Sequence, residues 1–136
     1  MKIPVRVYYQ DTDAGGVVFH AQYLAFMERA RTELLNDAGI DLARFAERHG
    51  LLFLVHELSV RYHQPGRLNE MLSVSAEVVK LGRASLVFRQ RVEHGRQLLV
   101  EAEVTLALVD RDRMKPARIP EELATALGAV HKQALK

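Results

Sequence analysis

The sequence contains no cysteine among its 136 residues. This absence excludes disulfide bonds, thiolate metal sites and cysteine nucleophiles, and it is typical of a reducing compartment. The first ten residues lack the apolar stretch of a signal peptide, and no apolar run in the chain approaches the roughly 20 residues needed to span a bilayer. We therefore expect a cytoplasmic protein without direct membrane insertion.

A strong excess of charge of either sign is also missing. There are 19 Lys and Arg residues against 17 Asp and Glu residues, for a formal net charge of +2. So small an excess argues against nucleic-acid binding but is compatible with a phosphate-bearing small ligand. No repeat, linker or low-complexity segment interrupts the chain. Because a typical domain has about 100 to 200 residues, we expect residues 1–136 to form a single domain with one site.

The N-terminal third of the chain predicts a strand, a glycine-containing turn and a long helix. The strand alternates apolar with mostly polar residues, and the turn follows at residues 11–18. From His20 onward the apolar residues recur at helical spacing until Gly39 ends the helix. The inward strand residues are Ile3, Val5, Val7 and Tyr9, and the apolar helix face consists of Tyr23, Met27, Ala30, Leu34 and Ala38, widened by Leu24, Phe26 and Leu35.

The remainder of the chain predicts four strands and two shorter helices. One helix runs from Leu42 to His49, with Asp41 as its N-cap and Gly50 beyond its end, and an amphipathic helix follows Pro120. We expect the pair Phe53-Leu54 and the strand around Val60 to lie in the core. The predicted strands are Leu52 to Tyr62, Met71 to Leu81, Ala84 to Glu93 and Leu98 to Asp110, and the last helix presents Leu123, Leu127, Val130 and Ala134 on one face.

The order of these elements predicts an α+β fold. A strand, a long helix and several strands joined by short turns form an antiparallel sheet that one helix covers. This is the layout of the hot-dog fold, in which the sheet wraps around a long central helix. A sheet of this size with one long helix and an exposed edge often buries more surface by dimerising, so we expect a homo-oligomer.

Residues 11–20 are the chemically dense segment of the chain. They place two aspartates and two glycines between the first strand and the long helix. A helix N-terminus presents unpaired N–H groups and a partial positive charge, which stabilise an oxyanion. Glycines nearby let a ligand approach the backbone closely, and a carboxylate beside them acts as a general base or as a nucleophile. Thioester hydrolysis needs these parts and neither a metal nor a cofactor.

The same segment resembles the signature of the 4-hydroxybenzoyl-CoA thioesterase family. Within that family the chain is similar to the YbgC-type acyl-CoA thioesterases, a branch associated with the Tol-Pal cell-envelope system. The similarity continues in three later segments, so it covers nearly the whole chain. The matching residues are Arg6-Val7, Thr12-Asp13, Gly16-Val17-Val18, His20 and Tyr23, and the later segments are Tyr62 to Leu68, Ser85 to Phe88 and Lys115 to Pro120.

The resemblance implies a role for several residues. Asp13 is then the catalytic carboxylate, and the main-chain N–H of His20 polarises the thioester carbonyl. Gly16 lies where the backbone approaches the substrate, and Tyr23 is a candidate for lining the acyl pocket. The resemblance also implies an acyl-CoA substrate, with acyl carrier protein as the alternative carrier, and homodimers commonly paired into homotetramers, with sites between subunits. It assigns no catalytic task to Asp11.

Simpler interpretations stand beside these roles. Asp11 also fits a turn cap, His20 a residue that starts a helix, and Tyr23 a core residue. The other histidines show no metal-ligand spacing, so we assign no metal. Five cations are candidates for contacting CoA phosphates, but alternating cations on a strand usually form a solvated face; these are Arg61, Lys80, Arg83, Arg89 and Arg91.

Other functions fit the segment less well or stay within the same fold. A calcium loop fails because Gly15 occupies a ligand position and Gln22 stands where a bidentate glutamate is needed. An aspartyl phosphatase needs alternating strands and helices. The remaining alternatives are a hydratase or dehydratase that uses Asp13 with the imidazole of His20, and a non-catalytic module that binds an acyl carrier or an envelope partner.

Overall fold

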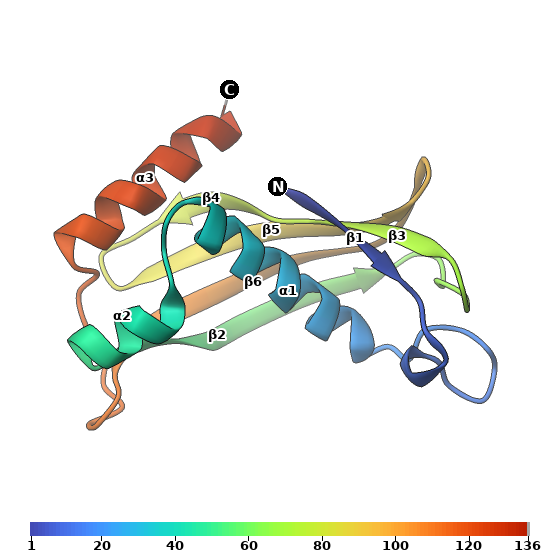
Figure 1. The fold of residues 1–136 in the computed structure, drawn as a ribbon, viewed down its shortest axis with the longest axis horizontal. Coiled ribbons are helices and arrows are strands. Elements are labelled where there is room, and N and C mark those ends of the chain that lie inside the picture. The colour runs from blue at the N-terminus through green and yellow to red at the C-terminus, as the bar shows by residue number, and fades with distance from the viewer. Residues whose placement is uncertain (136) are drawn as a thin grey trace.

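The computed structural model describes residues 1–135, with the side chains of residues 132–135 left out, so Lys136 and the predicted face position Ala134 lie outside what is described. Six strands and three α-helices follow one another along the chain (Figure 1). The elements are β1 (Lys2–Arg6), the short 3-10 helix η1 (Tyr9–Asp11), α1 (Gln22–Asp37), α2 (Leu42–His49), β2 (Leu51–Tyr62), β3 (Met71–Ser75), β4 (Glu77–Leu81), β5 (Ser85–His94), β6 (Gln97–Asp110) and α3 (Glu121–Leu135).

The strands form one antiparallel sheet in the order β1-β3-β5-β6-β2, and β4 also pairs with β5. The predicted strand Met71 to Leu81 was wrong in one respect, because it divides into β3 and β4 at Ala76. Ala76 is buried, and its N–H donates to the carbonyl of Met1 rather than to β5. The break therefore lets β3 pair with β1 while β4 continues along β5 on its own.

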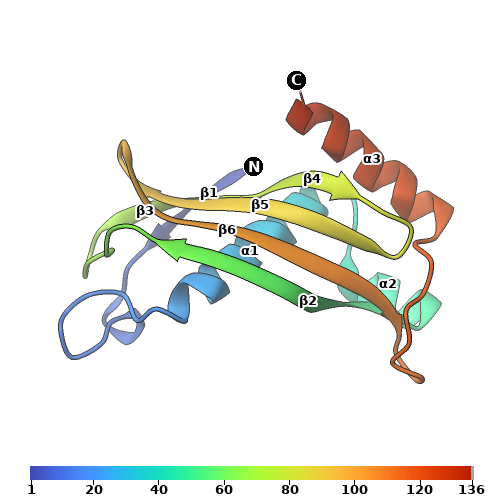
Figure 2. The ribbon, with the colours of Figure 1, turned by 180° about the vertical axis from the view of Figure 1, so that it is seen from behind.

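Helix α1 lies across the concave face of the sheet, as Figures 1 and 2 show from opposite sides. Its apolar face repeats at helical spacing because residues three and four apart share one side of a helix. Gly39 ends the helix with φ of +81°, a conformation that glycine adopts without strain. The predicted layout of a sheet wrapped around one long helix is confirmed. The buried residues of α1 are Tyr23, Phe26, Met27, Ala30, Arg31, Leu34 and Leu35.

The two shorter helices close the end of the sheet that lies far from the N-terminus of α1 (Figure 1). Helix α2 has the predicted ends: the Asp41 side chain accepts a hydrogen bond from the Arg44 N–H at 3.1 Å, and Gly50 is left-handed with φ of +64°. Leu123 and Leu127 of α3 are buried, and His131 contacts the carbonyl of Val79 in β4 at 3.1 Å. Helix α3 thus covers the edge of β4 that β1 does not reach.

Two predictions for inward-facing residues were wrong. Tyr9 is 81% exposed, because β1 ends at Arg6 and the chain turns into η1 before the alternation reaches Tyr9. Leu54 is 38% exposed, because β2 is the last strand of the sheet. Its neighbour Phe53 and also Val60 are partly buried against the core, as expected.

Among residues 1–135, no helix is both long enough and apolar enough to cross a membrane.

Candidate active site

The loop from Thr12 to Ala21 joins η1 to α1 and lies at the opposite end of the molecule from α2 and α3 (Figure 1). The Asp13 N–H donates to the Val17 carbonyl at 2.9 Å, and the Gly16 N–H donates to the Asp13 carbonyl at 3.1 Å. Gly16 has φ of +78°, a region that side chains disfavour, so a glycine is needed to close this tight turn. The turn presents residues 13–16 to solvent.

The Asp13 carboxylate is exposed but its direction is fixed. Its Oδ1 accepts a hydrogen bond from the Gly15 N–H at 2.8 Å. A side chain at position 15 would crowd it, because a Cβ there would lie 3.2 Å from the same oxygen. The second oxygen, Oδ2, makes none of the hydrogen bonds found within the described residues. Such a carboxylate is oriented and has a lone pair available to take a proton or attack a carbonyl.

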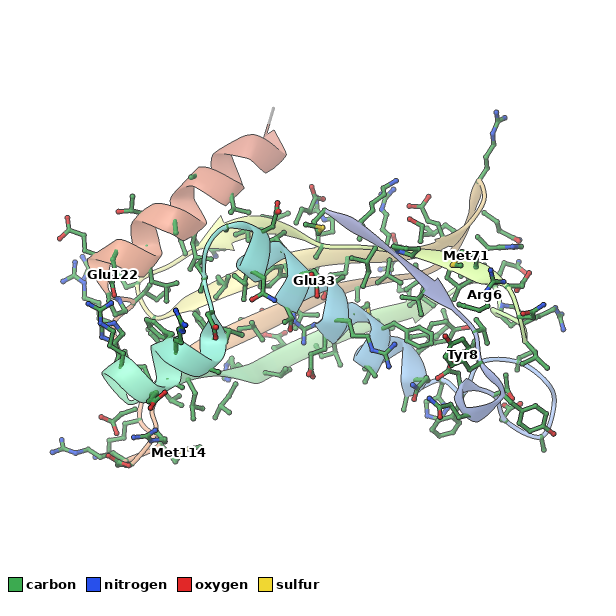
Figure 3. The ribbon with its side chains drawn as sticks, viewed as in Figure 1. Arg6, Tyr8, Glu33, Met71, Met114 and Glu122 are labelled. Carbon is green, nitrogen blue, oxygen red and sulfur yellow. The ribbon has the colours of Figure 1, made fainter. Side chains whose placement is uncertain are left out.

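The Asp11 carboxylate, in contrast, is only 3% exposed and has structural partners. Its Oδ2 accepts from the Tyr8 N–H at 2.8 Å, and its Oδ1 accepts from Nε2 of Gln22 at 3.0 Å. Its main-chain carbonyl accepts from the Phe19 N–H at 2.9 Å. Asp11 therefore ties η1 to the first residue of α1, which fits the turn-capping interpretation, and both of its carboxylate oxygens already accept a hydrogen bond. Figure 3 shows the exposed ring of Tyr8 at this end of the molecule.

His20 lies in the loop two residues before Gln22, the first residue of α1, near the positive end of the helix dipole. No hydrogen bond within the described residues uses its main-chain N–H, whereas its carbonyl accepts one from the Tyr62 hydroxyl at 3.0 Å. The exposed imidazole lies against the Phe19 ring with 4.5 Å between centroids. The backbone at position 20 thus offers a donor to a ligand, and the imidazole makes no hydrogen bond to the residues that the structure describes.

Tyr23 is only 2% exposed and is linked to the loop through Gly66. Its hydroxyl accepts a hydrogen bond from the Gly66 N–H at 2.8 Å, and the Gly66 carbonyl accepts one from the Val18 N–H at 2.9 Å. Burial raises the pKa of Tyr23 above its usual value, so its hydroxyl remains protonated at neutral pH. Tyr23 is thus a buried residue of the core, and its part in lining the acyl pocket stays a prediction.

Sequence reasoning did not include Gly66 or Tyr62 in the site. The available signal was the segment Tyr62 to Leu68, which carries part of the family resemblance and contains the Pro65-Gly66 turn. The spacing of neighbouring residues does not predict that this turn contacts the loop, because the residues joined by these hydrogen bonds lie more than 40 positions apart along the chain.

The cations considered for CoA phosphates lie mostly on the outer face of the sheet. Arg61, Lys80 and Arg89 line an open groove of about 720 Å³ together with three glutamates. Arg89 lies 3.9 Å from Glu103, and both side chains are about half exposed. This mixture of charges fits a solvated face better than an anion site.

A smaller cavity of about 540 Å³ lies between α2 and α3 and includes none of the residues of the loop from Thr12 to Ala21. Glu122, labelled in Figure 3, crosses it to His49 with 2.8 Å between Oε1 and Nε2. Its walls carry cations and anions in similar number, and the carboxylate of Asp41 there already accepts the Arg44 N–H as the cap of α2. The geometry that suits acyl chemistry is therefore at Asp13, at the other end of α1.

Comparison with known proteins gives consistent results for sequence and structure. Residues 15–101 match the family model described as the thioesterase superfamily. The chain is 48% identical to the acyl-CoA thioester hydrolase YbgC of Escherichia coli over 122 residues, which cover 88% of this chain and 90% of that protein. It is 43% identical to the acyl-CoA thioesterase YbgC of Haemophilus influenzae, with 90% of each chain covered.

A solved structure agrees as well. The crystal structure of a probable thioesterase from Bartonella henselae superposes with a TM-score of 0.82 and 34% sequence identity, covering 88% of this chain and 98% of that one.

Proposed function

This chain belongs to the thioesterase superfamily, and from that premise we propose how it works as an acyl-CoA thioesterase. The reaction adds water across the thioester bond and releases a free acid and the thiol of CoA. The observation that carries the mechanism is the Asp13 carboxylate, which one hydrogen bond from Gly15 orients while its second oxygen is left free. It lies on the loop that leads directly into the N-terminus of α1.

In the proposed mechanism the thioester carbonyl accepts a hydrogen bond from the main-chain N–H of His20. That N–H and the positive end of α1 stabilise the negative charge that develops on the carbonyl oxygen. Asp13 then takes a proton from an attacking water, or attacks the carbonyl itself to form an anhydride that water cleaves. In both routes the C–S bond breaks and the thiolate leaves, to be protonated by solvent. Neither route requires the His20 imidazole.

Two further residues have supporting roles in this proposal. Gly16 keeps the tight turn free of a side chain, so the substrate approaches the backbone closely. Tyr23 supports the loop from the core through Gly66 and does not need to contact the acyl group.

The experiment that tests this function is thiol release from a panel of acyl-CoAs, from short aliphatic through long-chain and aromatic, with matched acyl carrier protein thioesters. We expect hydrolysis of at least one CoA member, and the best one gives the chain-length class. A folded protein that releases no thiol from any member would contradict the proposal. Replacing His20 with alanine distinguishes the thioesterase from the alternative dehydratase. A dehydratase would lose its acid/base group and most of its activity, whereas a thioesterase keeps the backbone N–H donor and most of its activity.

We also propose that two copies pair through β2 to form a homodimer, with tetramers as pairs of such dimers. Strand β2 has 12 residues, lies last in the sheet order and exposes apolar side chains at an edge that is otherwise open to pairing. Tyr62, at the end of this strand, reaches the loop that carries Asp13, which supports a site close to the subunit boundary. The exposed apolar residues of β2 are Leu54, Val55, Leu58 and Tyr62.

A matched pair of variants tests the dimer. Val55 is 54% exposed on β2, and Met114, labelled in Figure 3, is 56% exposed in the turn after β6, outside β2. By sedimentation, Val55→Glu is expected to shift the protein to monomers and Met114→Glu to leave its mass unchanged. Equal masses for the two variants would contradict pairing through β2.

Three broader statements complete the proposal. Residues 1–136 act as one thioesterase domain, in the cytoplasm, and the physiological link is to the Tol-Pal cell-envelope system. They are supported by the sequence resemblance to the YbgC-type branch and by the identity to YbgC proteins over most of the chain.

A further inference from the structure

Tyr62 is the last residue of the edge strand β2, yet its side chain reaches the loop that precedes α1. Its hydroxyl donates to the His20 carbonyl at 3.0 Å. Its ring lies against Tyr23, with 5.8 Å between centroids and 58° between planes. Among the side chains of the sheet, as far as the chain is described, Tyr62 is the one that hydrogen-bonds the loop from Thr12 to Ala21. It therefore joins the loop to the sheet at the residue that carries the proposed donor.

The peptide groups on both sides of His20 are each fixed by hydrogen bonds. The Phe19 N–H donates to the Asp11 carbonyl at 2.9 Å, and the Phe19 carbonyl accepts from the Gln22 N–H at 2.8 Å. The next carbonyl, that of His20, is held by Tyr62. The main-chain N–H of His20 lies between these two fixed carbonyls and has no acceptor of its own among the described residues. The Phe19 carbonyl lies in the same planar peptide as this N–H and fixes its direction, and the Tyr62 hydrogen bond holds His20 from the following peptide.

We propose that Tyr62 is a positioning residue for the carbonyl-binding N–H of His20. This inference rests on the proposed function, because the N–H matters only if a thioester carbonyl binds there. Tyr62 acts through the His20 carbonyl and does not touch the reacting atoms. Without the hydroxyl, His20 loses its hydrogen bond to the sheet, so its Cα and the preceding peptide that carries the donor are held less firmly. The donor then spends less time in the direction that stabilises the developing oxyanion. Such a change lowers the rate of the chemical step and leaves binding of the rest of the substrate intact.

The test compares Tyr62→Phe with Tyr9→Phe. The first variant keeps the ring against Tyr23 and removes the hydrogen bond to His20. The second removes a hydroxyl that is exposed to solvent, since Tyr9 is 81% exposed and its hydroxyl makes no hydrogen bond within the described residues. Three quantities are measured for each: kcat and KM on the best acyl-CoA, the melting temperature, and the Kd of a thioether analogue in which CH2 replaces the carbonyl group.

For Tyr62→Phe we expect kcat to fall about tenfold, which is less than the hundredfold or more lost when an oxyanion donor is removed outright. The thioether Kd is expected to stay within about twofold of the wild type, because that ligand has no carbonyl to be positioned. The melting temperature is expected to match that of the wild type, and Tyr9→Phe is expected to match it in every quantity. This split between kcat and thioether affinity would not arise from a general loosening of the fold.

Two outcomes overturn the inference while the wild type still releases thiol. One is a kcat for Tyr62→Phe that equals that of Tyr9→Phe. The other is a loss of thioether affinity and of melting temperature in parallel with kcat, which marks Tyr62 as part of the pocket or of the fold alone. If the wild type itself releases no thiol from any thioester, the proposed function fails first, and this inference fails with it.

Discussion

Replacing Gln90 with leucine is expected to destabilise the fold by about 3 kcal/mol, although the two side chains are similar in size. Gln90 lies on β5 and is fully buried. Its Oε1 accepts from Nη1 of Arg31 at 2.8 Å, and its Nε2 donates to the carbonyls of Met27 at 2.8 Å and Ser75 at 3.2 Å. The amide thus joins α1 to the sheet and supplies the acceptor for the guanidinium of Arg31, a residue that is only 8% exposed.

The magnitude follows from what each partner loses. A hydrogen bond to a charged group contributes about 1.5 to 3 kcal/mol, and a buried donor left without an acceptor costs about 1 to 3 kcal/mol more. Burial already lowers the pKa of Arg31, so its charged form is disfavoured there even with the amide in place. The Met27 carbonyl lies inside α1 and keeps its helical partner, and the added apolar surface of leucine offsets part of the loss. We therefore expect a net loss of about 3 kcal/mol.

A double-mutant cycle with Arg31→Met measures the interaction directly. Urea unfolding gives the free energy of unfolding of the wild type, Gln90→Leu, Arg31→Met and the double variant. Because the double variant leaves no unpaired guanidinium, it is expected to be more stable than the sum of the single effects by at least about 1.5 kcal/mol. Gln97→Leu serves as a control on an exposed glutamine at the start of β6, with an expected change below about 0.5 kcal/mol. Additivity within about 0.5 kcal/mol would refute the reasoning.

Two other predictions concern the loop support and the turn after β6. A Cβ at Gly66 would lie 3.2 Å from Cγ2 of Val18, so Gly66→Ala is expected to lower the free energy of unfolding in urea by about 1 to 3 kcal/mol, and an unchanged value would show that the contact relaxes freely. Hydrogen bonds from the N–H of Arg113, and to a lesser extent of Asp112, lower the pKa of Asp110 in the folded protein. The ionised Asp110 carboxylate therefore stabilises the fold above the pKa that it has in the unfolded chain, and this stabilisation is lost as the pH falls through the lower pKa of the folded state. Below about pH 4 the melting temperature of Asp110→Asn is therefore expected to fall less steeply with pH than that of the wild type, and parallel curves would count against this.

Much of the fold was predictable from the sequence because its signals are local. Helix α2 begins and ends at the predicted residues, since an aspartate cap and a left-handed glycine are properties of a few neighbouring positions. The apolar face of α1 and the hairpin between β5 and β6 follow in the same way from periodicity and turn chemistry.

The errors came from tertiary context. Leu54 has the pattern of a core strand, but its exposure depends on β2 being the last strand of the sheet. Arg31 lies on the buried side of α1, and the buried amide that accepts its hydrogen bond is 59 residues away. The sequence pattern does not reveal such a partner, so the apolar face predicted for α1 did not include Arg31.

The candidate site shows the same division. The dense segment of aspartates and glycines identified the loop, and family resemblance distinguished Asp13 from Asp11. The surroundings of the two carboxylates differ, because Asp11 is buried and accepts from two donors whereas Asp13 is exposed and accepts from one. The catalytic role of Asp13 stays a prediction. The contributions of Tyr62 and Gly66 come from a segment distant along the chain, and local spacing could not have placed them beside His20.

The most direct test of the central claim is thiol release by Asp13→Asn on the best acyl-CoA of the panel. The asparagine keeps an oxygen to accept the Gly15 N–H and removes only the charge and the basicity. Asp112→Asn is the matched control, since the Asp112 side chain is 85% exposed in the turn after β6. We expect a loss of about a hundredfold or more in kcat for Asp13→Asn and none for the control. An Asp13→Asn variant that retains more than about a tenth of the wild-type kcat would contradict the assignment of Asp13 as the catalytic carboxylate.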